Sequence, residues 1–183
     1  MYNKKTDLFV ERWKDLFLEK SYGFFRKNMD GNSILDVGCG SGRDVHRFVS
    51  DGFESIGIDL SKEMVKYAKH NQRGSFFRMD MRKLEFESDI FDGVWCNSSL
   101  HHLPKEDAGK ALDEFKRVLK PGGILFVTVK EGSGEEIDKE GRFLVYYSIE
   151  ELEKLLEERR FQVISRYQSE SRTGKWIELF AIK

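Results

Sequence analysis

Three glycines and a carboxylate lie together near the start of the chain, in a pattern that suits close contact with a ligand. Gly38, Gly40 and Gly42 follow the apolar run 34–37, and Asp36 lies within that run. Glycine has no Cβ atom, so the backbone can turn tightly there and approach a bound group. A helix that starts after the turn offers unpaired backbone amides to the same group. On its own, this turn is typical of either a ligand-binding loop or a structural loop.

A second carboxylate, Asp59, ends the next apolar run, 17 residues after Gly42. At the end of a second parallel strand, a carboxylate can accept hydrogen bonds from both hydroxyls of a ribose. The alternative is a capping role, because Ser61 and a helical pattern follow directly. Turn and carboxylate together predict a nucleoside site. Arg43 stands where the dinucleotide fingerprint has its third glycine, which disfavours a nicotinamide cofactor.

The elements that must position these residues alternate between strand and helix patterns. The predicted strands cover 34–37, 55–59, 75–79, 91–96, 124–129, 161–168 and 176–182, the last two close enough to form a hairpin. The predicted helices cover 6–28 with a candidate break at Gly23, then 43–51, 61–71, 105–119 and a segment opened by the capping box of Ser148 and Glu151. This alternation predicts an α/β fold, doubly wound, with a parallel sheet and helices on both faces. Ligands of such sheets bind beyond the carboxyl ends of the strands.

The composition excludes several classes of protein. The 183 residues carry 31 Lys and Arg against 32 Asp and Glu, so no net positive charge favours a nucleic acid. No apolar run approaches the roughly 20 residues that span a bilayer, and the first residues lack a signal-peptide core. We therefore expect a cytoplasmic protein without a membrane partner, whose Cys39 and Cys96 are reduced thiols. The expected organisation is an N-terminal helical cap over 1–30 and one domain over 31–183.

Five motifs in the expected order give the sequence a specific resemblance. They are 34–42, 57–61, Asp80-Met81, the stretch from 91–94 to 100–103, and the turn 119–123. Together they resemble the class I S-adenosylmethionine-dependent methyltransferases, over roughly residues 30–183. The resemblance implies a methyltransferase enzyme with S-adenosyl-L-methionine as its cofactor. It also implies a seven-stranded, mostly parallel sheet with an antiparallel C-terminal hairpin.

The resemblance further implies which residues hold the cofactor. Asp36 and the three glycines would hold its methionine end, and Asp59 would hold its ribose. Leu60 would pack on the adenine, while Asp80 and the backbone amide of Met81 would read the adenine edge. The two residues at the end of the fourth strand would lie near the ammonium group. The full implied site is Asp36, Gly38, Cys39, Gly40, Gly42, Asp59, Leu60, Met64, Asp80, Met81, Cys96 and Asn97.

The acceptor side of the site is defined by fewer residues. A sulfonium methyl group is already electrophilic, so a base is needed only if the acceptor arrives protonated. The candidate catalytic residues are His101, His102, Tyr146 and Tyr147, with a packing role as the alternative for each. The segment 131–147 has no clear period and is predicted to run over the pocket as a loop that determines substrate choice.

The predicted function is methyl transfer to a small-molecule acceptor, with no metal and no nucleic acid, in a monomer or homodimer. Two alternatives stay open. One is a regulatory protein that binds S-adenosylmethionine without catalysis. The other is a methyltransferase that acts on a macromolecule, which is disfavoured because the sequence shows neither a basic tract nor an appended binding domain.

Overall fold

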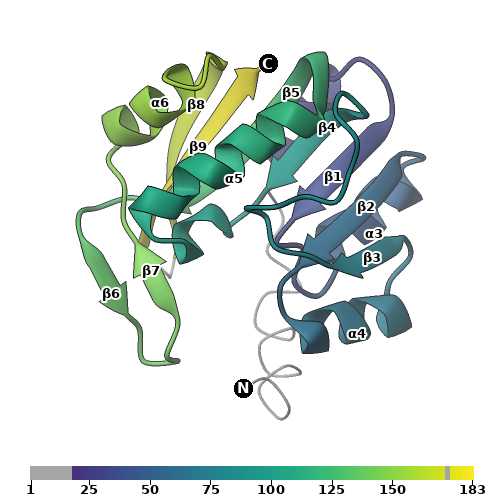
Figure 1. The fold of residues 1–183 in the computed structure, drawn as a ribbon, viewed down its shortest axis with the longest axis horizontal. Helices are drawn as coiled ribbons and strands as arrows, with labels where there is room; N and C mark the ends of the chain where they lie inside the picture. Colours follow the sequence, from purple (N-terminus) through teal and green to yellow (C-terminus); the bar gives the residue numbers. More distant parts are fainter. Residues whose placement is uncertain (1–17, 172–173) are drawn as a thin grey trace.

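Residues 18–171 and 174–183, which the computed structural model describes, form a seven-stranded sheet with helices on both faces (Figure 1). The strand order is β3-β2-β1-β4-β5-β9-β8. The strands are β1 (Ser33–Val37), β2 (Glu54–Asp59), β3 (Ser75–Arg78), β4 (Phe91–Cys96), β5 (Leu119–Lys130), β8 (Gln162–Ser171) and β9 (Gly174–Ile182). The helices are α2 (Glu19–Lys27), α3 (Arg43–Ser50), α4 (Lys62–Asn71), α5 (Lys105–Val118) and α6 (Ile149–Glu157), with a 3-10 turn η1 (Leu100–His102).

The strand directions confirm the predicted fold. Strands β1 to β5 run parallel to their neighbours, whereas β9 is antiparallel to both β5 and β8. The sheet is therefore doubly wound and mostly parallel, with an antiparallel C-terminal hairpin. Because the parallel strands end at one edge, residues from several strands meet there.

Both faces of the sheet are apolar. Successive side chains of a strand point to opposite faces, so Ile34 and Trp95 pack with α2 and α3, while Leu35 and Val94 pack with α5 and α6. Figure 1 shows α5 and α6 lying across one face of the sheet. A sheet covered on both faces needs continuous hydrophobic strands, which explains why the central strands show little alternation in sequence.

Trp95 is the centre of an aromatic cluster that joins the sheet to α2 and α3. Its ring centroid lies 3.9 Å from that of Phe126, 5.1 Å from Phe25 and 5.5 Å from Phe48. Aromatic pairs at such separations contribute about 0.5–1.5 kcal/mol each beyond the area that they bury. Since Phe25 belongs to α2, this helix is an integral part of the core.

Helix α2 corrects one expectation and leaves another untested. Gly23 lies inside α2, which continues to Lys27, so the helix does not break at this glycine. Gly23 is exposed and no tertiary contact requires it there. The first part of the helix predicted over 6–28, up to residue 17, lies outside the described residues. The helical cap over 1–30 stays a prediction.

The segment 131–147 is a β-hairpin, which corrects the prediction of a loop. Strand β6 (Glu135–Ile137) pairs with β7 (Phe143–Val145) in an antiparallel two-stranded sheet. Asp138 closes the turn, because its Oδ1 accepts the backbone amides of Glu140 at 2.8 Å and Arg142 at 2.9 Å. All of β6 is exposed, so neither face of that strand shows the apolar alternation that would have predicted it.

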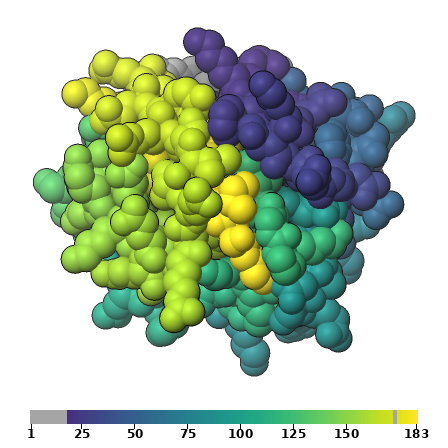
Figure 2. Space-filling view, turned by 90° about the horizontal axis from the view of Figure 1, so that it is seen from above, coloured from purple at the N-terminus to yellow at the C-terminus, as the bar shows by residue number. Residues whose placement is uncertain are grey.

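The first and last described segments lie side by side. Figure 2 shows the purple α2 segment beside the yellow and yellow-green residues of the C-terminal hairpin. The ring centroid of Phe24 lies 4.6 Å from that of Phe180 and 6.2 Å from that of Tyr167. The hydroxyl of Ser21 donates a hydrogen bond to the Glu178 carboxylate. These contacts fix α2 against both β9 and β8.

Gly93 in β4 permits the close approach of α2, because a Cβ atom there would lie 2.5 Å from Phe25 Cζ and 2.8 Å from Met29 Sδ. We predict that Gly93→Ala lowers the free energy of unfolding by about 1–3 kcal/mol, as overpacking of a core does. Urea denaturation measures this change.

The matched control is Gly23→Ala, where an added Cβ meets nothing within 4 Å. Inside a helix this change should raise the free energy of unfolding by about 0.5–1 kcal/mol. If Gly93→Ala were as stable as the unchanged protein, α2 would not pack against β4 as described.

Candidate functional site

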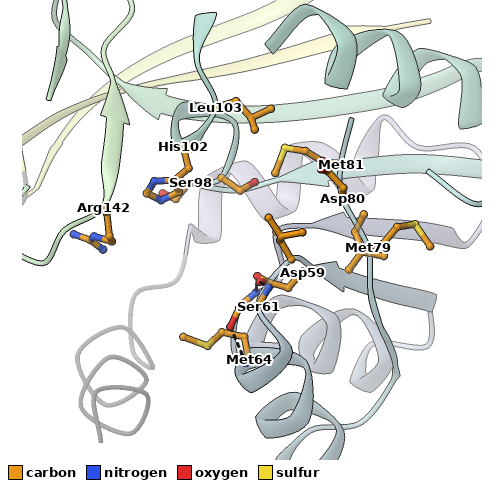
Figure 3. A pocket seen from close by; sticks show the side chains of 15 residues that line it. Asp59, Ser61, Met64, Met79, Asp80, Met81, Ser98, His102, Leu103 and Arg142 are labelled. Carbon is orange, nitrogen blue, oxygen red and sulfur yellow. Dashed lines mark hydrogen bonds between the residues drawn. The ribbon is translucent and has the colours of Figure 1, made fainter. Parts of the chain in front are cut away.

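A pocket of about 240 Å³ lies beyond the carboxyl ends of β1, β2 and β4 (Figure 3). This is the edge at which parallel sheets bind ligands. The pocket is lined by Gly38, Gly40, Ile58, Asp59, Leu60, Ser61, Met64, Met79, Asp80, Met81, Ser98, Ser99, His102, Leu103 and Arg142. Seven of the twelve predicted cofactor residues and one of the four predicted catalytic residues are among them.

The glycine turn brings backbone close to the pocket. Gly38 has a positive φ of 71°, and its amide donates to the Ile58 carbonyl at 2.8 Å, which ties the end of β1 to β2. A Cβ atom on Gly38 would lie 2.3 Å from Ser99 Cβ, so no larger residue fits beside this serine. Ser99 itself donates to the Val37 carbonyl at 2.6 Å. Glycine is thus required at 38 by both conformation and space.

Asp59 joins the glycine turn to the start of α4. Its Oδ2 accepts the Gly40 amide at 2.9 Å and its Oδ1 accepts the Ser61 amide at 2.8 Å. The helix cap itself is Ser61, whose hydroxyl accepts the Met64 amide at 3.3 Å. A carboxylate offers about four acceptor positions, so two remain for hydroxyl donors. Burial raises the pKa of Asp59, and the two amides oppose that shift.

Asp36 provides a buried acceptor without a donor. Its side chain is 2% exposed, and Oδ2 has no hydrogen-bond partner among the described residues. Burial raises the pKa of Asp36 well above its ordinary value, and the negative charges of Asp44 and Asp59 add to this shift. Buried carboxylates normally have partners. The residues around the glycine turn therefore suit a ligand that brings positive charge.

Like Asp36, the other four predicted cofactor residues lie around the lining rather than in it. Gly42, with a φ of 79°, begins α3, and the half-buried Cys39 lies in the turn before it. Cys96 is buried with Sγ 3.1 Å from Ser99 Oγ, and burial raises its pKa to about 12. Asn97 donates from its side chain to Asp44 at 3.0 Å. These side chains support the turn and the end of β4, and their contact with a cofactor stays a prediction.

His102 lines the pocket, and its Nδ1 lies 2.9 Å from the backbone oxygen of Phe143 in β7. A carbonyl oxygen only accepts, so Nδ1 carries the proton and the neutral ring keeps Nε2 as an acceptor. Although His102 is exposed at the mouth of the pocket, the surrounding protein removes enough hydration to lower its pKa below the ordinary 6.5. The ring is therefore neutral at neutral pH and able to accept a proton.

His101 lies behind His102, with the two ring centroids 4.5 Å apart. It is 2% exposed, and its Nδ1 has no hydrogen-bond partner among the described residues. Burial lowers the pKa of His101 well below its ordinary value. Its ring also packs edge-on against Trp176, at 5.5 Å. His101 is placed to support its neighbour, and the lining of the pocket does not include it.

The two tyrosines of the hairpin lie outside the pocket lining. The hydroxyl of Tyr146 donates to Glu136 across the hairpin at 2.6 Å. Tyr147 is buried in the core, with the Lys105 ammonium 5.2 Å from its ring centroid. Their predicted catalytic roles stay predictions. The residue that this segment contributes to the lining is Arg142.

Several lining residues were missed from the sequence: Ile58, Ser61, Met79, Ser98, Ser99, Leu103 and Arg142. Ser98 and Ser99 directly follow β4, so the rule that ligands bind at strand ends could have found them. No sequence signal pointed to Arg142, because it reaches the pocket from the turn of the unpredicted hairpin. Within the described residues, no group of three or more His, Cys, Asp or Glu is placed to hold a metal ion, and no helix could span a membrane.

Residues 35–127 match the family described as a methyltransferase domain. The match covers just over half of the chain and includes the glycine turn, Asp59 and the serines after β4. The chain belongs to the class I S-adenosylmethionine-dependent methyltransferases. The predicted family is thereby confirmed, as is S-adenosylmethionine as the cofactor of that family.

Individual relatives are similar over different lengths. The malonyl-(acyl-carrier protein) O-methyltransferase of Erwinia pyrifoliae is 36% identical over 106 residues, which cover 57% of this methyltransferase chain and 40% of that protein. A S-adenosylmethionine-dependent methyltransferase structure from Methanosarcina mazei has a TM-score of 0.80 at 23% identity, covering 92% of this chain and 98% of that one.

A third relative was solved with ligands. The 1,6-didemethyltoxoflavin-N1-methyltransferase of Burkholderia thailandensis, with 1,6-didemethyltoxoflavin and S-adenosylhomocysteine bound, has a TM-score of 0.82 at 22% identity, over 98% of this chain and 84% of that one. The structural likenesses establish the fold of this methyltransferase chain. The chain spans less than half the length of the curated relatives that it matches.

The contact between His102 and Phe143 generates a prediction about the imidazole. We predict that NMR titration of the folded protein gives His102 a pKa below the ordinary 6.5. We also predict that its neutral ring carries the proton on Nδ1. The spectrum of His102→Asn assigns the signal. A neutral ring protonated on Nε2 would show that the Phe143 carbonyl does not hold the imidazole.

Proposed function

We propose that this chain transfers a methyl group from S-adenosylmethionine to a small-molecule acceptor bound in the same pocket. The observation that carries the proposal is the buried Oδ2 of Asp36, which has no hydrogen-bond partner within residues 18–171 and 174–183 and lies beside the glycine turn, at the ligand-binding edge of the sheet. When bound, S-adenosylmethionine supplies an electrophilic methyl group on a positively charged sulfur. A cationic ligand suits this side of the pocket, because burial raises the pKa of both Asp36 and Asp59 and a nearby positive charge would favour their ionised forms.

Each part of the lining has a proposed role toward the cofactor. Asp36 and the glycine turn hold the methionine end, together with backbone after β4. Asp59 uses its two remaining acceptor positions for the ribose hydroxyls. Leu60, whose side chain is 59% exposed in the pocket, covers the adenine. Asp80 and the Met81 amide read the adenine edge, although Asp80 also pairs with Arg82 at 2.6 Å.

The chemistry asked of the protein is mainly alignment. Transfer forms a bond between the acceptor atom and the methyl carbon while the methyl–sulfur bond breaks, and its electrons stay on sulfur. Holding the two partners in line can contribute about 7–11 kcal/mol. For an acceptor that arrives as O–H or N–H, we assign His102 Nε2 as the group that takes the proton. This role needs the neutral ring, so activity falls as pH falls through the pKa of His102.

A small-molecule acceptor is favoured over a macromolecule. The β6–β7 hairpin contributes Arg142 to the lining of the pocket, and its Phe143 carbonyl holds the imidazole of His102. Two relatives are named for small molecules, a demethylrifamycin and the ubiquinone pathway, while another is named for a malonyl group on the acyl-carrier protein. A regulatory protein without catalysis is the second candidate, and the positioned imidazole argues against it. Cytoplasmic localisation and a monomeric or homodimeric state stay predictions.

The first test is binding of the cofactor and its product. We predict that isothermal calorimetry gives micromolar dissociation constants for S-adenosylmethionine and S-adenosylhomocysteine, corresponding to roughly −8 kcal/mol. NAD, which shares the adenosine but not the amino-acid end, is the control and should bind far more weakly. Binding of NAD in preference to both sulfur nucleosides would refute the proposal.

The second test separates the two roles of Asp59. We predict that Asp59→Asn weakens S-adenosylhomocysteine binding by roughly 10–100-fold, the value of charge-assisted hydrogen bonds to the ribose. Its free energy of unfolding should fall by only about 1 kcal/mol.

The matched control for Asp59→Asn is Ser148→Ala, which removes the cap of α6 outside the pocket lining. Ser148→Ala should also lower the free energy of unfolding by about 1 kcal/mol, without changing the affinity for S-adenosylhomocysteine. A loss of stability in Asp59→Asn with unchanged affinity would leave Asp59 with a structural role alone.

A further inference from the structure

The charges around the pocket are divided between its two sides. The acids of the lining, Asp59 and Asp80, follow β2 and β3, whereas the arginine of the lining, Arg142, belongs to the β6–β7 hairpin. In Figure 3, Arg142 lies beyond His102, at the opposite end of the lining from Asp80 and Asp59. Acids at one end of the lining suit hydrogen-bond donors of a ligand, and the N–H groups of an arginine at the other end suit acceptors. The cofactor accounts for the acidic side and leaves the basic side for the acceptor.

Arg142 is held in one orientation by the turn that carries it. Asp138 Oδ2 lies 2.8 Å from Nε and 2.6 Å from Nη2, and Glu140 lies 3.4 Å from Nη2. Within residues 18–171 and 174–183, no recorded hydrogen bond or ion pair uses Nη1. A guanidinium has five N–H donors in a rigid fork. One edge of the fork is therefore fixed, and the donors on Nη1 are left for a ligand.

We propose that the acceptor carries a carboxylate or phosphate group and that Arg142 binds this anion, which places the atom to be methylated beside His102. This inference rests on the proposed function, because it names the class of acceptor for the same pocket. Arginine suits the role, since its planar fork forms charge-assisted hydrogen bonds to both kinds of anion. With the anion fixed at one end and the cofactor at the other, the acceptor has a defined direction across the pocket.

The positive charge of Arg142 also acts on the basic groups near it. Arg142 itself pairs with Asp138 and Glu140, and Asp138 also acts on Lys130 and His102. Burial lowers the pKa of Lys130, at the end of β5, and the positive charge of Arg142 lowers it further. Burial is the main cause of the lowered pKa of His102, and the positive charge of Arg142 adds to it. A bound anion would reduce the repulsion among these groups.

The experiment uses three probes that share one ring: benzoate, phenyl phosphate and uncharged benzamide. Their affinities for the protein saturated with S-adenosylhomocysteine are measured by NMR titration. At least one anion is expected to bind about tenfold more tightly than benzamide, as a charge-assisted contact requires. The tighter of benzoate and phenyl phosphate shows which anion the acceptor carries. Equal affinity for all three probes would overturn the inference.

The variants assign the preference to Arg142. Arg142→Gln should abolish it, and Arg142→Lys should keep part of it, because lysine retains the charge without the fork. The matched control is Arg166→Gln, since Arg166 pairs with Glu153 at 2.7 Å on β8, outside the pocket. It should leave the preference unchanged. If Arg142→Gln keeps the full preference, or only lowers the unfolding midpoint, Arg142 serves the hairpin turn and the inference is wrong.

The outcome also separates this inference from the proposed function. Failure of S-adenosylhomocysteine to bind would refute the proposed function before any probe is added. Binding of S-adenosylhomocysteine without a preference for anions would refute only the assignment of Arg142.

Discussion

The carboxylate of Asp44, in the first turn of α3, connects the core of the protein to its pocket. Its side chain is only 14% exposed, and it accepts hydrogen bonds from Arg43, from Trp95 Nε1 at 3.0 Å and from Asn97 Nδ2 at 3.0 Å. Burial alone would raise its pKa, but Arg43 and these donors lower it, so the group is held ionised. A negative charge is also favoured at the start of a helix by the helix dipole.

This contact and the glycine turn beside it link the ends of β1, β4 and β5. Trp95 anchors the aromatic cluster, so its bond to Asp44 fixes α3 relative to β4. Asn97 links the same carboxylate to Thr128 in β5, at 3.2 Å. The turn from β1 into α3 must then pass close to Ser99, which only Gly38 permits. The pocket is therefore a consequence of how three parallel strands end, rather than of any single loop.

The predictable part of the molecule is the part determined by local pattern. The strands around Asp36 and Asp59 could be predicted because buried parallel strands are short apolar runs between glycines and helices. The residues of the glycine turn and of the second strand could be assigned for the same reason. Gly23 shows the limit of such reasoning, since a single glycine in an exposed helix position costs too little to end the helix. The hairpin was missed because β6 and β7 have three residues each and β6 buries none.

The acceptor side was unpredictable for a physical reason that also explains how it works. Arg142 is distant in sequence from His102, and the two are brought together only when β7 places its Phe143 carbonyl against the imidazole. That bond fixes the tautomer of His102 and joins the imidazole to the hairpin that carries Arg142. In the proposed function, the same hairpin then orients the proton acceptor and binds the substrate. A change in the hairpin would alter both together, while the cofactor residues on β1 and β2 would keep their positions. Loops and hairpins on a fixed scaffold can diverge in this way, and the fold supports different acceptors without changing how it holds the cofactor.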